Sequence, residues 1–204
     1  AGLAGASKSY RDDLALAQRL AQALPGVDLF QRDLSVASSK IGNVQMEQGQ
    51  LAEALKSYQD GLAIDLKIAQ AKPQDTESQS DLAVSYVKVG DAQVAQGRLA
   101  EALKSYRDSL NVRERLAKAN PTDGYAQRQL SIAHERIGDV QVAQGDLAGA
   151  LRSYTQSIAI LGALVQSDPT NKAWQRDLTV LYDRVGDVEI AQGSLCLLYT
   201  SPSP

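Results

Sequence analysis

The chain has 204 residues, of which 44% are hydrophobic and 22% are charged, the balance of an ordinary globular protein. Its formal net charge of −3 supplies no basic field for nucleic acid or for an anionic membrane surface. The single cysteine, Cys196, excludes an intrachain disulfide and fits a reducing compartment, so we expect a cytoplasmic protein. The longest apolar run, 195–199, falls far short of the ~20 residues that a membrane-spanning helix needs.

Apolar residues recur at helical spacing in eight segments of the chain. In chain order, we expect helices over 1–24, 28–48, 51–71, 81–96, 99–119, 128–144, 147–165 and 174–192. The first of these and every second one after it end before Pro25, Pro73, Pro121 and Pro169. The others end at Gly49, Gly97, Gly145 and Gly193, where glycine tolerates the left-handed backbone that closes a helix. We call the glycine-ended helices A and the proline-ended helices B.

A nine-residue stretch that closes each A helix recurs at a constant step of 48 residues. It reads Ile-Gly-Asn-Val-Gln-Met-Glu-Gln-Gly at 41–49 and returns with few changes at 89–97, 137–145 and 185–193. Tyrosines keep the same step at 10, 58, 106 and 154, and the octapeptide Leu-Ala-Glu-Ala-Leu-Lys-Ser-Tyr is identical at 51–58 and 99–106. Such a period, with short connections, predicts an all-α solenoid of stacked antiparallel helix pairs.

The repeat resembles the tetratricopeptide repeat, whose signature is W-x2-L-G-x2-Y, then A-x3-F, then P. The matching residues are Tyr86, Val89, Gly90, Gln93, Gly97, Ala102, Tyr106 and Pro121. The usual period is about 34 residues, so each helix here is longer by about seven residues, roughly two turns. The closest resemblance is to long-repeat bacterial members of the family, and it covers residues 1–195. It implies a right-handed superhelical stack in which the glycine permits close approach, the alanine tight packing, and the tyrosine fills the space beside them.

The register divides the chain into a half repeat over 1–25, repeats over about 26–73, 74–121 and 122–169, and a half repeat over 170–195. Residues 196–204 depart abruptly from the repeat, and we interpret them as a sequencing or vector scar. Both ends are half repeats without a polar capping helix. We therefore expect a fragment of a longer protein, able to self-associate through its uncapped ends.

No constellation in the sequence predicts chemistry. His134 is the single histidine, and it stands where the other repeats have Ser38, Tyr86 and Tyr182, so we interpret it as a packing substitute. The sequence has no phosphate-binding loop, no nucleotide fingerprint and no zinc spacing. We expect no catalytic, cofactor-binding or metal-binding residues.

The tetratricopeptide resemblance implies that the A helices line an inner groove. Our candidate contacts in it are Lys40, Asn43, Lys88, Asp91, Arg136, Asp139, Arg184 and Asp187. One interpretation of this row is a solvated face in which each cation pairs with the acidic residue three positions later, a weak interaction. The other is a groove that binds a peptide through paired hydrogen bonds. The clamp that family members use for chaperone C-termini is not expected, because the position before each cation holds Ser39, Val87, Glu135 and Asp183 instead of lysine.

We therefore expect a non-catalytic scaffold that binds a protein or peptide, with no nucleic-acid or membrane partner. The alternative is the regulatory or sensor arm of a larger signalling NTPase or protease. The groove hypothesis expects that charge reversal at Arg136 and Asp139 abolishes partner capture without changing the melting temperature. Two further expectations are that the four repeated tyrosines belong to the core, and that Lys8, Lys56, Lys104 and Arg152 form a solvated outer row.

Overall fold

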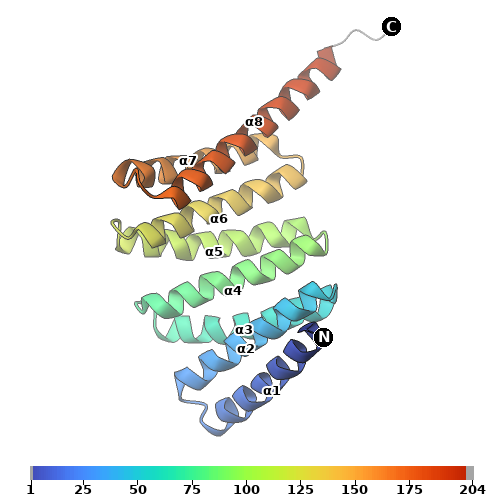
Figure 1. The fold of residues 1–204 in the computed structure, drawn as a ribbon, viewed down its shortest axis with the longest axis vertical. Coiled ribbons are helices and arrows are strands. Elements are labelled where there is room, and N and C mark those ends of the chain that lie inside the picture. Colours follow the sequence, from blue (N-terminus) through green and yellow to red (C-terminus); the bar gives the residue numbers. More distant parts are fainter. Residues whose placement is uncertain (1, 201–204) are drawn as a thin grey trace. The chain divides into compact units, whose positions relative to one another are not determined.

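The computed structural model describes residues 2–200, with side chains over 8–193. The helices are α1 (Gly2–Ala23), α2 (Asp28–Glu47), α3 (Leu51–Ala71), α4 (Thr76–Ala95), α5 (Leu99–Ala119), α6 (Gly124–Ala143), α7 (Leu147–Ser167) and α8 (Lys172–Thr200). The part of the chain that the structure describes contains no strand. This confirms the all-α solenoid fold with eight helices (Figure 1). The A helices are α2, α4, α6 and α8, and the B helices are α1, α3, α5 and α7.

The chain forms two compact units, Ala1–Val112 and Arg113–Pro204, and the division falls inside α5. In the first unit, α1 packs on α2, α2 on α3 and α3 on α4. In the second unit, α6 packs on α7 and α7 on α8. Each unit also brings its A helices into contact, α2 with α4 and α6 with α8. Each unit is thus a stack of antiparallel helix pairs in which one A helix touches the next.

The A helices begin earlier than the apolar pattern predicts. Their first residues are Asp28, Thr76, Gly124 and Lys172, again 48 apart, whereas we expected starts at 81, 128 and 174 for the last three. Capping side chains explain the difference. The Asp75 carboxylate accepts a hydrogen bond from the Ser78 amide at 3.0 Å, and Asp123 accepts one from the Tyr125 amide at 2.9 Å. These polar turns carry no apolar periodicity, so the pattern missed them.

Three of the four expected glycine terminators adopt the left-handed backbone. The φ angles of Gly49 and Gly97 are 73°, and that of Gly145 is 79°. The expectation at Gly193 is wrong, because α8 continues through it to Thr200. After the other three glycines, the sequence begins a B helix whose alanine and tyrosine pack back on the A helix. Residues 194–200 lack that pattern and are rich in leucine, a good helix former, so nothing turns the chain. The expected tail over 196–204 lies partly in α8, and 201–204 lie outside the described residues.

The core of each helix pair is built as the repeat predicts. Ala54, Ala102 and Ala150 are fully buried, and the tyrosines that follow them, Tyr58, Tyr106 and Tyr154, are at most 4% exposed. Each tyrosine ring lies on the glycine of the preceding A helix. A Cβ atom on Gly42 or Gly90 would come within 2.5 Å of the ring of Tyr58 or Tyr106. The glycine is therefore required by the close approach of the ring.

Repeated polar contacts fix the register of each helix pair. Ser57, Ser105 and Ser153 on the B helices each donate to the glutamine at 45, 93 or 141 on the preceding A helix, at 2.7 Å. Near the start of each A helix, Gln31, Gln79 and Gln127 donate to a carbonyl in the last turn of the preceding B helix, at 2.8–3.1 Å. These donors satisfy carbonyl groups that a helix end leaves without intrahelical partners.

One polar core residue has no counterpart in the repeat pattern. Asp65 on α3 is 5% exposed and accepts hydrogen bonds from Ser35 at 2.7 Å and from Ser85 at 2.5 Å. Burial raises the pKa of its carboxyl group, and the two serine hydroxyls partly oppose that shift. The carboxylate ties α3 to both of its A-helix neighbours, α2 and α4.

The glycine–tyrosine contact can be tested with two substitutions at the same position of the repeat. Gly90→Ala places a methyl group against the Tyr106 ring and should lower the free energy of unfolding by about 1–3 kcal/mol. Gly186 has nothing within 4 Å, so Gly186→Ala should raise it by about 0.5–1 kcal/mol through helix propensity alone. Urea unfolding at a dilution where the chain is monomeric measures both. Equal effects at the two positions would contradict this account.

Candidate functional site

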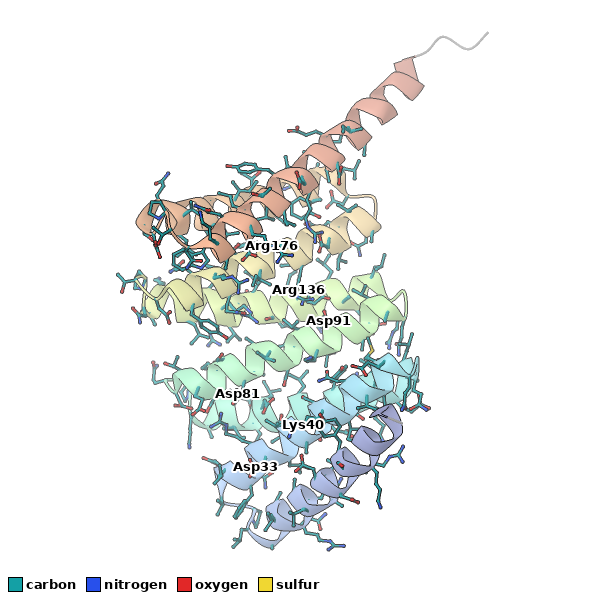
Figure 2. All side chains as sticks on the ribbon, viewed as in Figure 1. Asp33, Lys40, Asp81, Asp91, Arg136 and Arg176 are labelled. Atoms are coloured by element: carbon teal, nitrogen blue, oxygen red, sulfur yellow. The ribbon has the colours of Figure 1, made fainter. Side chains whose placement is uncertain are left out.

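The candidate residues lie on one face of the A helices, but most of them are already engaged with the protein itself. Figure 2 shows Lys40 on α2, Asp91 on α4 and Arg136 on α6. Along each helix, the cation and the acidic or amide residue three positions later face the same side. All eight candidates are half-buried except Asp187, which is exposed.

In the first unit, Asn43 is an acceptor shared by two helices. Its side-chain oxygen accepts a hydrogen bond from the Tyr58 hydroxyl at 2.9 Å and another from the Lys88 ammonium at 2.9 Å. The Lys88 nitrogen also lies 5.9 Å from the centroid of the Tyr58 ring, within the range of a cation–π interaction. Lys88 thus reaches from α4 to α2 across the tyrosine of α3.

Lys40 makes the corresponding contacts with α1, since no A helix precedes it in the described chain. Its nitrogen lies 5.9 Å from the centroid of the Tyr10 ring and 3.2 Å from the Asp13 carboxylate. In the next repeat, Asp91 accepts a hydrogen bond from the Tyr106 hydroxyl at 2.7 Å. In both cases, the tyrosine donates to the residue one position after the packing glycine.

The second unit repeats the contacts of Asn43, but its acceptor is a charged carboxylate, Asp139. Asp139 accepts a hydrogen bond from the Tyr154 hydroxyl at 2.8 Å and forms an ion pair with Arg184 of α8. Arg184 also pairs with Glu135 at 3.1 Å. Burial lowers the pKa of the Arg184 guanidinium, but Asp139 and Glu135 outweigh it, so the net shift is upward. Arg136 is half-buried on the same face of α6.

The pairing therefore differs from the self-pairing interpretation of the sequence. Lys88 and Arg184 reach back 45 residues to the preceding A helix, whereas the self-pairing interpretation placed the partner three residues ahead. Within each unit, α2 contacts α4 or α6 contacts α8, and a lysine or arginine side chain is long enough to span such a pair. We call this set of contacts the inter-repeat ladder: a tyrosine hydroxyl donates to position 43, 91 or 139, and at 43 and 139 a cation from the next repeat joins it.

Burial and nearby carboxylates raise the pKa values of two tyrosines in the ladder. Burial, reinforced by the nearby carboxylates of Asp91 and Glu47, raises the pKa of Tyr58 to about 12. Burial and the hydrogen bond to Asp139 also raise the pKa of Tyr154. Both phenols stay neutral and act as hydrogen-bond donors at physiological pH. The expectation that the four repeated tyrosines belong to the core is confirmed for Tyr58, Tyr106 and Tyr154 and is wrong for Tyr10, which is half-buried because α1 contributes no second helix to cover it.

A second row of ion pairs joins the first turns of the A helices, and sequence reasoning missed it. Arg32 pairs with Asp81 and with Glu77, each at 2.7 Å, and Arg128 pairs with Asp177 at 2.7 Å. Arg32 and Arg128 each lie 49 residues before the aspartate they bind. The signal was present as an arginine in three of the four repeats and an aspartate, one position later, also in three of the four.

An exposed apolar position accompanies the charged rows. Val36, Val84 and Val180 are 52%, 44% and 40% exposed, and Ile132 at the same position of the third repeat is half-buried. Each lies one helical turn before the cation of its repeat, on the same face. The 48-residue step of this position was readable from the sequence. Each unit thus presents two β-branched side chains beside its charged residues, Val36 and Val84 in the first and Ile132 and Val180 in the second.

The single histidine is a buried packing residue. His134 is 8% exposed, and burial lowers the pKa of its imidazole, as expected for a neutral packing residue. A hollow of about 400 Å³ is lined by Asp139, Val142, Tyr154, Arg184, Asp187 and Val188. Within the described residues, no group of three or more His, Cys, Asp and Glu side chains could hold a metal ion, and no helix is both long and apolar enough to cross a membrane. Lys8, Lys56, Lys104 and Arg152 are exposed, as expected of an outer row.

No protein-family model matches the chain, and no curated protein matches it. Among solved structures, it is similar to BtubC (BKLC) from P. vanneervenii, with 14% identity over 100% of this chain and 95% of that one, at a TM-score of 0.46. It is also similar to MamA protein, with 14% identity over 98% of each chain and a TM-score of 0.45. A third is the de novo designed helical repeat protein DHR64, with 13% identity over 90% of this chain and 96% of that one, at a TM-score of 0.38. Likeness at this level says nothing about a partner.

The ladder changes what a charge reversal in the row should do. Asp139→Lys removes the acceptor of Tyr154, places a cation beside Arg184, and should lower the free energy of unfolding by about 2 kcal/mol. Asp33→Lys is the matched control, because Asp33 is exposed on the same face of α2 and should change stability by less than about 0.5 kcal/mol. Thermal and urea unfolding, at a dilution where the chain is monomeric, measure both. An unchanged melting temperature for Asp139→Lys would contradict the ladder.

Proposed function

We propose that the chain is a long-period tetratricopeptide array that binds a peptide segment of another protein without catalysing a reaction. The resemblance rests on the A-x3-F and glycine positions of the repeat, here Ala54, Tyr58 and Gly42 and their counterparts. These residues make the packing contacts that the family pattern implies. The proposal concerns the exposed face of the A helices in each unit.

The exposed β-branched position is the observation that carries the proposal. Folding gains about 25 cal/mol for each Å² of apolar surface removed from water, so one exposed valine means little. A valine that stays 40–52% exposed in three of four repeats, on one face of the A helices, is a regular feature that packing does not require. Regularly spaced apolar side chains within a polar surround are typical of a protein-binding surface.

Polar and charged residues on the same face of the A helices supply the polar surround. They are the candidates Lys40, Asn43, Lys88, Asp91, Arg136, Asp139, Arg184 and Asp187. Asn43 gives its oxygen to the ladder, which leaves its amide NH2 as a donor, and a lysine ammonium has three donors. In this arrangement, the β-branched side chains provide affinity, and the held polar groups orient the peptide. Fixing those groups by internal contacts lowers the entropy lost when a peptide binds.

The first unit offers the sharpest test, because both of its valines are well exposed. Peptides selected from a random phage-displayed library against the whole chain are labelled, and their affinities are measured by fluorescence anisotropy. Val36→Asp combined with Val84→Asp should weaken binding at least roughly tenfold, the loss of about 1.4 kcal/mol, with little change in melting temperature. Lys56→Glu combined with Lys104→Glu alters exposed residues of the B helices and should leave affinity unchanged.

Two outcomes would contradict the proposal. One is a selection that yields no peptide whose binding survives dilution and competition. The other is a set of peptides that bind the valine double variant and the wild-type chain equally well. In the second case, binding would lie on another surface.

A further inference from the structure

The A helix of the last repeat presents a face that the other A helices cover. On α2, α4 and α6, the glycine of the nine-residue stretch holds a tyrosine ring of the next B helix. On α8, Gly186 has nothing within 4 Å, while Tyr182 and Ile190 are 57% and 69% exposed. Asp187 follows that glycine and is exposed, and no described residue hydrogen-bonds to its carboxylate.

The first helices present the complementary half of the same contact. Tyr10 on α1 keeps the register of the three buried tyrosines and lies under Lys40, as Tyr58 lies under Lys88. Tyr58, Tyr106 and Tyr154 each donate their hydroxyl to position 43, 91 or 139. Among the described residues, the Tyr10 hydroxyl has no such acceptor.

The charged groups at the two ends also match. Arg176 on α8 and Asp33 on α2, both labelled in Figure 2, are exposed, and neither has an ion-pair partner within the described residues. They occupy the positions that pair elsewhere in the chain as Arg32 with Asp81 and Arg128 with Asp177. Among the described residues, α2 thus carries an aspartate without an ion-pair partner, and α8 carries an arginine without one.

A second copy placed in register brings these groups to the sequence spacings of the internal contacts. Within the chain, the tyrosine bond spans 15 residues, the cation bond 45 and the first-turn ion pair 49. Four steps of 48 make 192, so a second copy placed in register carries residue n at n + 192. Tyr10 of the second copy then takes position 202, which is 15 residues after Asp187 of the first copy. Lys40 of the second copy takes position 232, which is 45 residues after the same Asp187. Asp33 of the second copy takes position 225, which is 49 residues after Arg176 of the first copy. All three spacings are those of the internal bonds.

We propose that α8 of one copy binds α1 and α2 of a second copy, head to tail, through the interface that joins successive repeats within the chain. The Tyr10 ring packs on Gly186 and its hydroxyl donates to Asp187, which also accepts the Lys40 ammonium. Asp33 pairs with Arg176, and the exposed Tyr182 and Ile190 are covered. The contact is heterologous, so each added copy leaves a free end and association does not stop at a dimer.

Sedimentation velocity of the 204-residue chain, from low micromolar to several hundred micromolar, tests the proposal. The weight-average mass should rise with concentration beyond that of a dimer. Gly186→Trp fills the seat of Tyr10 and should hold the chain monomeric at every concentration. Gly162→Trp is the matched control, because Gly162 of α7 also has nothing within 4 Å and lies outside the interface. It should associate like the wild type.

A charge exchange tests the register itself. Asp33→Lys and Arg176→Asp each place like charges across the interface, so each variant alone should need at least roughly tenfold more protein to associate. The double variant carrying both changes restores opposite charges and should recover association. A chain that stays monomeric, a Gly186→Trp variant that still associates, or a double variant that does not recover would each overturn the proposal.

Discussion

The structure depends on one acceptor side chain that follows the packing glycine of α2, α4 and α6. Position 43, 91 or 139 receives a tyrosine hydroxyl from the following B helix, and at 43 and 139 it also receives a cation from the next A helix. The tyrosine can reach it because glycine one position earlier lets the ring lie against the A helix. A single side chain therefore joins three consecutive helices. Repeats that contact only their neighbours need such a connection, since no larger core holds them together.

This constraint separates the structural residues of the A-helix face from those that are open to a partner. Lys88, Asp139 and Arg184 make hydrogen bonds or ion pairs inside the protein, so a peptide that competed for them would have to displace those contacts. The exposed β-branched position has no internal role of this kind. The same logic applies at the ends of the chain, where Asp187 and Tyr10 carry the two halves of a ladder that nothing in the described chain completes.

The sequence predicted the features that follow from its period. The eight helices and the buried alanine and tyrosine were readable because four copies repeat the same spacing. The partner of Lys88 was not readable, since one helix shows which face a side chain occupies but not how close the next A helix lies. The buried carboxylate of Asp65 was not readable either, because this position varies between repeats. The other repeats hold Ala17, Arg113 and Leu161 there. Gly193 was misread because a glycine closes a helix only when the following residues can pack back.

A pair of double-mutant cycles on the unfolding free energy of the monomer tests most directly whether the ladder runs between repeats. Arg184→Ala is combined once with Asp139→Ala, across the repeats, and once with Asp187→Ala, three residues along the same helix. The account predicts a coupling of about 1 kcal/mol or more in the first cycle and about 0.5 kcal/mol or less in the second. The reverse order, or no coupling in either cycle, would contradict it.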